Sequence, residues 1–305
     1  MCNKKQCVIW GSGFGLYGYL PAAVNCGYQV FVPKRYQTVF VARKELLCYT
    51  DDVFFIENEK SVLKKGSLCI IAKRPEDQYI LAQQISNAFG AEKIVLEKPL
   101  APTPEKARKL CKLLLDSHEN IHIGYSFLYT EWGKRVCKSL TQKRKASLSI
   151  EWTFMAHHFQ HNIDNWKRYM ASGGGALRFY GIQLIGILAV ADNWEVVESS
   201  LYCTDKDENV CWKAKISCRD SCLVEICVNS KSETQKFCCH LKEKDTDEYL
   251  YERKSPFIET VEMHDCRVPI LEQIISFEGD QSVFIKRSIE LWSLIEKKSR
   301  IVIVD

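Results

Sequence analysis

The chain has 305 residues, of which 46% are hydrophobic and 26% are charged, and its formal net charge is +4 at pH 7. This composition excludes a disordered protein, and the length favours two domains with sizeable cores. The small net charge, with no basic stripe interleaved with aromatics, argues against a nucleic-acid partner. The longest apolar run, near residues 184–191, is far shorter than the roughly 20 residues of a membrane span, so we expect no membrane partner.

Cysteine usage and the N-terminal segment indicate the compartment. The 15 cysteines include no C-x-x-C pair and no zinc-ligand spacing. Residues 1–13 lead directly into an apolar strand and a glycine loop, without the apolar segment of a signal peptide. We therefore expect a cytoplasmic protein whose thiols are mostly reduced, since buried cysteine behaves as a small hydrophobic residue.

Short apolar segments alternate with helical patterns over the first 125 residues. The predicted helices cover residues 16–26, 75–89 and 103–115. Strands that read as continuous apolar runs are buried on both faces, which indicates a parallel sheet flanked by helices. The predicted strands are residues 7–10, 29–32, 52–56, 67–72, 93–96 and 121–124.

A glycine loop, Gly11-Ser12-Gly13-Phe14-Gly15, follows the first predicted strand. At this position glycines let the backbone approach a pyrophosphate at a helix N-terminus, where unpaired N–H groups favour anions. The motif departs from G-x-G-x-x-G, because its third glycine stands one place early. The strand–loop–helix context favours nucleotide binding over a plain tight turn. We expect Gly11, Gly13, Phe14 and Gly15 to contact the cofactor.

Basic residues follow the second and fourth predicted strands. The second strand leads to Lys34 and Arg35, where an NAD enzyme usually offers Asp or Glu to the ribose hydroxyls. Two cations favour a 2′-phosphate, and hence NADP over NAD. The alternative is an exposed basic turn. Ala72, Lys73 and Arg74 follow the fourth strand and are expected along the same edge of the sheet.

Several segments resemble one known family. VLEKPLAPTPEKARKL, after the fifth predicted strand, is similar to the E-K-P segment of the glucose–fructose oxidoreductase/inositol dehydrogenase (Gfo/Idh/MocA) family of NAD(P)-dependent sugar oxidoreductases. GSGFGLYGYLPA resembles the family's glycine loop, and IGYSFLY resembles its crossing into the second domain. NWKRYMASGGGAL resembles its approach to the substrate helix. The resemblance covers roughly residues 5–190.

This resemblance implies an α/β fold with two domains. Residues 1–124 are expected to form a Rossmann dinucleotide-binding domain. Residues 125–305 are expected to form a substrate-binding and oligomerisation domain on a large, mostly antiparallel open sheet, which implies a homo-oligomer. Residues 282–298 are amphipathic and look like a late helix that returns to the first domain. Alternation predicts strands at residues 147–154, 196–203, 210–218, 222–228 and 234–241.

The chemistry that the resemblance implies is hydride exchange between a nicotinamide and a sugar carbon. It requires a group that exchanges the hydroxyl proton and a cation that stabilises the alkoxide. The E-K-P lysine, Lys98, is expected to supply the cation, and desolvation that lowers its pKa would also let it act as the base. Glu97, Lys98 and Ser126 are expected at the cofactor. The alternative for Lys98 is a surface lysine before a turn proline.

One departure from the family pattern bears on catalysis. The triple-glycine motif normally continues as G-G-G-x-L-x-D-x-G-x-H, and its Asp and His positions hold Phe179 and Gln183 here. Neither side chain exchanges protons usefully near neutral pH. Three explanations stay open. Lys98 acts alone, Tyr180 or a loop histidine replaces the missing base, or the protein binds its ligands without turnover. The candidate catalytic residues are Lys98, Tyr180 and Gln183.

Polar residues before and after the triple glycine are candidates for substrate binding. The loop before it carries three histidines within five residues, which fits a polar substrate-facing loop, a surface loop or, least well, a metal site; the family implies no metal. Arg178 could bind a substrate carboxylate or phosphate, or form a structural salt bridge. If it converges with Lys167, an anionic sugar is the expected ligand. The candidate substrate contacts are His158, His161, Trp166, Lys167 and Arg178.

The sequence therefore predicts an NAD(P)-dependent oxidoreductase acting on a nucleotide sugar or acidic sugar, in the biosynthesis of surface carbohydrate. The alternative is a catalytically degenerate relative that binds nucleotide as a sensor or scaffold. A third and weaker hypothesis is a hydrolase or lyase that retains NAD as a bound redox group.

Overall fold

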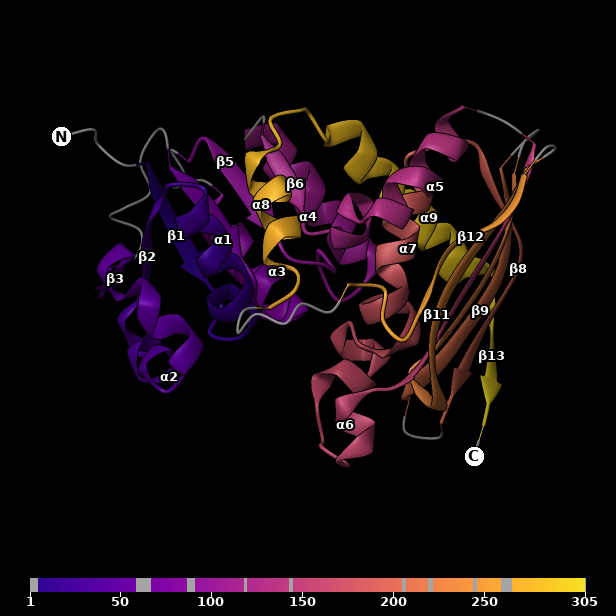
Figure 1. The fold of residues 1–305 in the computed structure, drawn as a ribbon, viewed down its shortest axis with the longest axis horizontal. Coiled ribbons are helices and arrows are strands. Elements are labelled where there is room, and N and C mark those ends of the chain that lie inside the picture. Colours follow the sequence, from indigo (N-terminus) through magenta and orange to yellow (C-terminus); the bar gives the residue numbers. More distant parts are fainter. Residues whose placement is uncertain are drawn as a thin grey trace. The chain divides into compact units, whose positions relative to one another are not determined.

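The structure, a computed structural model, describes residues 5–58, 67–86, 91–117, 120–142, 145–204, 207–218, 222–243, 246–258 and 265–304. The chain divides into two compact units, whose elements are labelled in Figure 1. Unit 1 comprises Met1–Leu100, Lys109–Ser126 and Phe257–Val283. Unit 2 comprises Ala101–Arg108, Phe127–Pro256 and Phe284–Asp305. The predicted domain boundary after residue 124 stays a prediction.

Unit 1 is built on a six-stranded sheet in the order β3-β2-β1-β4-β5-β6, and every neighbouring pair is parallel. This is the strand order of the dinucleotide-binding fold. All residues of β4, β5 and β6 are buried, as the continuous apolar runs predicted. The strands are β1 (Gln6–Trp10), β2 (Gln29–Pro33), β3 (Val53–Ile56), β4 (Leu68–Ile71), β5 (Lys93–Leu96) and β6 (Ile121–Ile123).

A helix from the last quarter of the chain packs on this unit. Figure 1 shows α8 (Val268–Ser276) beside α1 (Leu20–Asn25). Asn25 Nδ2 donates to Glu272 Oε1 at 2.7 Å, and the Cys26 thiol lies 3.6 Å from Ser276 Oγ. The other helical segments before β6 are η1 (Gly15–Tyr19), η2 (Lys34–Tyr36), α2 (Gln37–Val41), η3 (Lys44–Asp52), α3 (Pro75–Ile85) and α4 (Pro104–Ser117).

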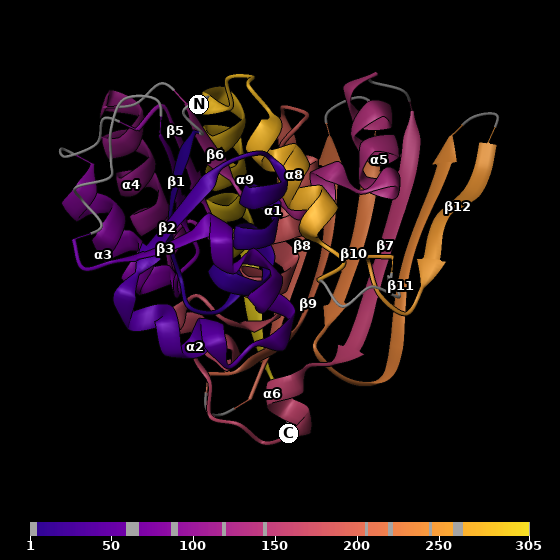
Figure 2. The same cartoon turned by 60° about the vertical axis from the view of Figure 1, so that its left-hand side comes forward.

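Unit 2 is built on a seven-stranded sheet in the order β12-β11-β7-β10-β9-β8-β13, part of which is visible in Figure 2. Four neighbouring pairs are antiparallel, whereas β7 pairs with β10 and β8 with β13 in parallel. This mixed but mostly antiparallel sheet confirms the predicted fold class. The strands are β7 (Ala146–Met155), β8 (Trp194–Cys203), β9 (Asn209–Cys218), β10 (Cys222–Asn229), β11 (Lys231–Glu243), β12 (Thr246–Arg253) and β13 (Ser299–Ile303).

One face of this sheet is apolar and covered, and the other carries charge. Trp152, Trp212 and Phe237 are buried, and the Trp212 ring packs against Gly181, where a Cβ would lie 2.5 Å from it. On the other face Lys215 pairs with Glu225 at 3.0 Å. The helical segments of the unit include α5 (Glu131–Thr141), α6 (His157–Gln160), η6 (Trp166–Arg168), η7 (Met170–Ser172), η8 (Ala176–Gly181), α7 (Ile182–Leu188), and most of η5 (Ser126–Tyr129) and of α9 (Ser282–Lys298).

Two further observations concern the described residues. None of their helices combines the length and the apolar character that a membrane crossing requires. Their cysteines are all free thiols. The helix predicted to return to the first domain, residues 282–298, belongs to unit 2 from Phe284 onward, and α8 is the helix that joins unit 1.

Candidate functional site

The glycine loop of unit 1 follows β1, and two of its glycines are closely packed, Gly11 more tightly than Gly15. Gly11 has φ +142°, and a Cβ on it would lie 2.2 Å from the Ala72 carbonyl oxygen. A Cβ on Gly15 would lie 3.2 Å from Ile9 Cγ2. Ala72 follows β4 and donates its N–H to the Trp10 carbonyl at 2.7 Å, which draws the loop against the ends of both strands. These glycines therefore fix the path of the loop.

Gly13 differs, because no atom lies within 4 Å of the position its Cβ would take. The N–H groups of Ser12 and Gly13 donate to no other residue in the described ranges. The Gly13 carbonyl accepts from Leu16 N–H at 2.9 Å and Tyr17 N–H at 3.2 Å, which begins the helical segment η1. Unpaired N–H groups beside open space at the start of a helix fit a diphosphate. The loop can therefore hold a dinucleotide.

The basic residues after β2 have partners of their own. Lys34 Nζ lies 2.6 Å from Glu57 Oε1, with both side chains mostly exposed. The Arg35 guanidinium lies 5.1 Å from the centre of the Tyr36 ring. The Lys34–Glu57 pair places a carboxylate next to a cation, so the choice between NADP and NAD stays a prediction. After β4, Lys73 is half-buried and Arg74 is exposed.

Glu97 and Lys98 follow β5, and the parallel sheet brings them to the same edge as the glycine loop. Glu97 Oε2 accepts a hydrogen bond from the Tyr19 hydroxyl at 2.8 Å. Gly124, after β6, leaves room for this contact, because its Cβ would lie 2.4 Å from the Tyr19 oxygen. Burial raises the pKa of Glu97, while the Lys98 charge and the Tyr19 hydrogen bond oppose that shift. Ser126, also predicted here, is buried and donates its N–H to the Gly124 carbonyl at 2.9 Å.

Gln78 of α3 holds the backbone on both sides of Lys98. Its Nε2 lies 2.6 Å from the Glu97 carbonyl, 3.2 Å from that of Pro99 and 3.2 Å from that of Leu100. Neither Gln78 nor Tyr19 was predicted as part of the site. No short motif marks either one, because each reaches the E-K-P segment through the fold of the sheet.

In unit 2, the triple glycine allows a neighbouring loop to pack directly on the backbone. Gly173 and Gly175 have φ values of +82° and +86°. A Cβ on Gly174 would lie 2.3 Å from the Trp166 carbonyl oxygen. Asn209 Oδ1 accepts from Leu177 N–H at 2.9 Å, which satisfies a donor in the first turn of the next helix. The glycines thus bring the turn that carries Trp166 and Lys167 against the start of that helix.

Phe179, at the position of the family's aspartate, is the centre of an aromatic cluster. Its ring lies 5.3 Å from the Trp166 ring and 5.0 Å from the Lys167 ammonium. The Tyr180 ring lies 4.8 Å from both Phe179 and Phe154. Three predicted site residues, Trp166, Lys167 and Tyr180, therefore meet around Phe179. Aromatic packing and a cation–π contact therefore occupy the position at which the family that the sequence resembles has a carboxylate.

The Tyr180 hydroxyl is the polar group of this cluster that suits proton donation. It makes no hydrogen bond to any residue in the described part of the chain. Burial raises the pKa of Tyr180, so the phenol stays protonated through the neutral range. A protonated phenol donates a hydrogen bond or a proton to a carbonyl oxygen. Gln183 is buried, and its Oε1 lies 3.4 Å from the Phe127 N–H that it accepts from.

The loop that carries the three histidines, residues 157–161, has one buried and one exposed candidate residue. His158 is only 4% exposed, and its Nε2 has no partner among the described residues. Burial, followed by the charges of Lys167 and Arg168, lowers the pKa of His158 to about 4. His161 is exposed, with its ring 4.4 Å from that of His157. The described residues contain no group of three His, Cys, Asp or Glu arranged to hold a metal.

The buried His158 predicts a pH dependence of stability. Its pKa is about 4 in the folded chain against 6.5 for an ordinary histidine, so the unfolded state binds the proton first as the pH falls. Stability is therefore lost between about pH 6.5 and 4. Between pH 7.5 and 5, the wild type should lose about 2 kcal/mol more unfolding free energy than His158→Phe. Urea unfolding at both pH values measures this. His161→Gln should follow the wild type, and equal losses in all three proteins would contradict it.

Arg178 forms an ion pair inside unit 2. Its Nε lies 2.7 Å from Glu296 Oε1, its Nη2 lies 2.8 Å from Glu296 Oε2, and its Nη1 donates to the Met170 carbonyl at 2.6 Å. The two side chains are 11% and 16% exposed. All three guanidinium nitrogens thus have protein acceptors. This geometry favours the structural salt bridge over the substrate contact that the sequence also allowed.

Removing this guanidinium should destabilise unit 2. Arg178→Met leaves a mostly buried carboxylate without its cation, and it should lower the free energy of unfolding by about 3 kcal/mol. Lys215→Met, which breaks the more exposed pair with Glu225, should cost less than about 1 kcal/mol. Chemical denaturation compares the two. Unchanged stability together with a raised KM for substrate would instead support the substrate contact.

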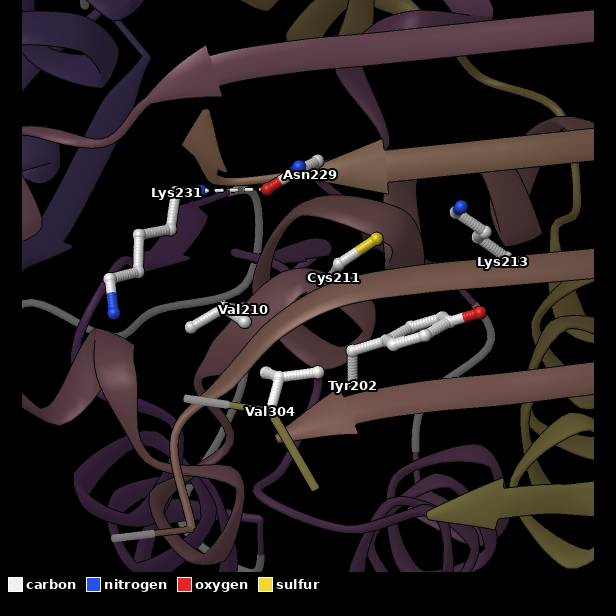
Figure 3. Close-up of a pocket in the computed structure, with 7 residues that line it drawn as sticks. All are labelled: Tyr202, Val210, Cys211, Lys213, Asn229, Lys231 and Val304. Atoms are coloured by element: carbon white, nitrogen blue, oxygen red, sulfur yellow. Dashed lines mark hydrogen bonds between the residues drawn. The ribbon is translucent and has the colours of Figure 1, made fainter. Parts of the chain in front are cut away.

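A shallow hollow of about 350 Å³ lies elsewhere on unit 2, at the ends of β8, β9 and β10 (Figure 3). None of the predicted site residues lines it. In Figure 3 the Lys231 and Lys213 side chains stand at opposite sides of it, and Lys231 N–H donates to Asn229 Oδ1 at 3.1 Å. The lining residues are Tyr202, Val210, Cys211, Lys213, Asn229, Lys231 and Val304.

Comparison with known proteins supports the fold. Neither a protein-family profile nor a curated protein sequence matches the chain. KijD10, a 3-ketoreductase from Actinomadura kijaniata solved with NADP and TDP-benzene, superposes with a TM-score of 0.71 at 15% identity, over 99% of this chain and 100% of that one. The chain shares this fold. GenD2 from gentamicin A biosynthesis, solved with NAD, gives a TM-score of 0.70 at 13% identity, over 98% and 95% of the chains.

The match extends to a third protein. The WlbA dehydrogenase from Bordetella pertussis, solved with NADH and UDP-GlcNAcA, gives a TM-score of 0.68 at 12% identity, over 96% of this chain and 85% of that one. At these identities the likeness establishes the architecture, and the residues described above carry the functional argument.

Proposed function

We propose that this chain is an NAD(P)-dependent oxidoreductase of a sugar derivative, either a nucleotide sugar or an acidic sugar, and that it belongs to the Gfo/Idh/MocA family. The observation that carries the proposal is that the unpaired N–H groups of Ser12 and Gly13 border open space. They lie on the same sheet edge as Glu97 and Lys98. The proteins that share the fold were solved with NADP, NAD or NADH, one of them with TDP-benzene and another with UDP-GlcNAcA.

The residues divide into those that hold the cofactor and those that act on the substrate. The bound nicotinamide supplies the hydride. The role proposed for Lys98 is to stabilise negative charge on the substrate oxygen, and the role proposed for Tyr180 is to donate a proton when a ketone is reduced. Reduction of a ketone needs a group that is protonated near neutral pH, which a phenol is, so reduction is the proposed direction. The proposed cofactor contacts are Gly11, Gly13, Phe14, Gly15, Lys34, Arg35, Ala72, Lys73, Arg74, Glu97, Lys98 and Ser126.

The remaining features of the proposal follow from the sequence. Residues 1–124 form the dinucleotide-binding domain, and residues 125–305 form the substrate-binding domain, through whose open sheet the protein is a homo-oligomer. His158, His161, Trp166 and Lys167 contribute to substrate binding, and Gln183 to catalysis. NADP is preferred to NAD, the location is cytoplasmic, and the product enters surface carbohydrate.

A second candidate function is nucleotide binding without turnover, as a sensor or scaffold. Phe179 favours it, because its ring is packed where the family has an ionisable aspartate. The two candidates differ in one assay. Purified protein is mixed with NADPH or NADH and a panel of nucleotide-linked ketosugars, and the absorbance of the reduced nicotinamide is followed. Its decay supports the oxidoreductase. Saturable cofactor binding with no decay on any sugar supports the sensor, and no binding contradicts both.

A further inference from the structure

Arg267, a residue from the last quarter of the chain, lies against the glycine loop of unit 1. Its guanidinium lies 4.1 Å from the centre of the Phe14 ring, which is cation–π distance, and Phe14 directly follows Gly13. Phe14 itself is held in place. Its ring lies 5.3 Å from the Tyr19 ring, and a Cβ on Gly18 would lie 2.3 Å from it. The guanidinium therefore lies against the residue that follows the unpaired N–H groups of the loop.

The orientation of this guanidinium is fixed by its partner, Asp265. Arg267 Nε lies 2.8 Å from Asp265 Oδ1, and Nη2 lies 2.7 Å from Oδ2. The backbone N–H of Arg267 also donates to Oδ1 at 2.9 Å. The third nitrogen, Nη1, makes no hydrogen bond to any residue that the structure describes. One donor of a rigid, preorganised fork thus remains for a ligand.

Arg267 also lies within electrostatic range of Glu97. Burial lowers the pKa of Arg267, but its bonds to Asp265 and the nearby Tyr17 and Glu97 offset this and raise it overall. In turn, the Arg267 charge opposes the burial that raises the pKa of Glu97. The arginine is therefore near both the glycine loop and the E-K-P segment. A dinucleotide in the proposed site has its diphosphate at the glycine loop, against which Arg267 lies, and its nicotinamide directed towards Lys98.

We infer that Arg267 binds the diphosphate of the nicotinamide cofactor through Nη1, with Asp265 and Phe14 as its positioning residues. This inference rests on the proposed function. It assigns a phosphate contact to a residue about 250 positions from the glycine loop, at the start of the helix that packs on α1. The unpaired N–H groups of Ser12 and Gly13 approach the diphosphate from the loop, and Arg267 adds a full positive charge.

The test is the affinity of wild type and Arg267→Met for NADPH, NADH and ADP-ribose, a probe that keeps the diphosphate and lacks nicotinamide. Loss of a charge-assisted hydrogen bond should weaken the wild type's preferred reduced cofactor and ADP-ribose alike, by about 10- to 100-fold. Arg267→Lys should be intermediate, because lysine keeps the charge without the fork. Arg253→Met is the matched control. That arginine faces a tyrosine ring in unit 2, and its loss should leave all affinities unchanged.

Three outcomes overturn the inference, and they are distinguishable. If Arg267→Met binds as tightly as wild type, the contact is absent and the proposed function stands. If it loses affinity for the reduced cofactors but not for ADP-ribose, the arginine contacts the nicotinamide end instead. If wild type binds none of the three ligands, the proposed function fails and the inference falls with it. Should Arg267→Met not fold because Asp265 is left unpaired, the double variant Asp265→Asn/Arg267→Met removes both charges and serves the same comparison.

Discussion

Replacing Lys98 with alanine should reduce ketosugar turnover by about 10²–10³-fold and weaken cofactor binding by no more than about tenfold, because the other proposed cofactor contacts remain. The variant removes the charge that stabilises the substrate oxygen as hydride arrives, and loss of one such group typically costs about 10²–10³-fold in kcat. Steady-state kinetics and cofactor titration separate the two quantities. The Gln78 hydrogen bonds are to backbone carbonyls and survive the change, so the E-K-P segment should keep its shape.

Two further variants test whether the loss of turnover is specific to Lys98. Lys215→Ala changes a lysine on the sheet of unit 2 that pairs with Glu225, and it should not alter turnover. Tyr180→Phe should lower turnover by about 10²-fold while retaining the ring contacts of the aromatic cluster. If Lys98→Ala retains more than a tenth of wild-type turnover, Lys98 is not the group that stabilises the substrate oxygen.

The second large effect is expected for Gly13→Asp, which should weaken cofactor binding by at least about 100-fold. A carboxylate there enters the open space beside the unpaired N–H groups, occupies them and repels the diphosphate. Folding should be little affected, since nothing lies within 4 Å of the Cβ and an acidic residue at a helix start is stabilising. Fluorescence titration with NADPH and NADH, together with thermal unfolding, measures both effects.

The matched variants of the same loop separate binding from folding. Gly13→Ala adds a methyl group without charge and should weaken cofactor binding less than Gly13→Asp, because it crowds the diphosphate without repelling it. Gly11→Ala should instead destabilise the fold by several kcal/mol, because its Cβ would meet the Ala72 carbonyl and its φ is +142°. Wild-type affinity in Gly13→Asp would show that the cofactor does not use this loop.

The strands of unit 1 were predictable because they are short and mostly apolar. β4, β5 and β6 are buried along their length, and a parallel sheet is the arrangement that buries such strands on both faces. β12 and β13 were not predicted. They are the two edges of the unit 2 sheet, and the sequence of β12, TDEYLYER, is polar with no apolar face to reveal it. The place of α8 depends on contacts such as Asn25–Glu272, which join residues far apart in sequence.

The candidate site also has parts that the sequence predicted and parts that it did not. The glycine loop and the E-K-P segment are each a single stretch of sequence directly after a predicted strand. Their position at one sheet edge therefore followed from the strand order. Tyr19, Gln78 and Arg267 act through side chains that contact groups distant in sequence, and no spacing marks them. For Arg178, the sequence left two roles open, because the choice depends on whether a carboxylate such as Glu296 lies nearby.

The most direct test of the central claim, that unit 1 holds a nicotinamide dinucleotide at its glycine loop, is calorimetric titration of NADPH and NADH into the wild-type chain. We expect saturable binding of at least one of them at one site per chain. The same titration into Gly13→Asp should give no measurable heat of binding. Absence of binding of both cofactors to folded wild-type protein would contradict the account.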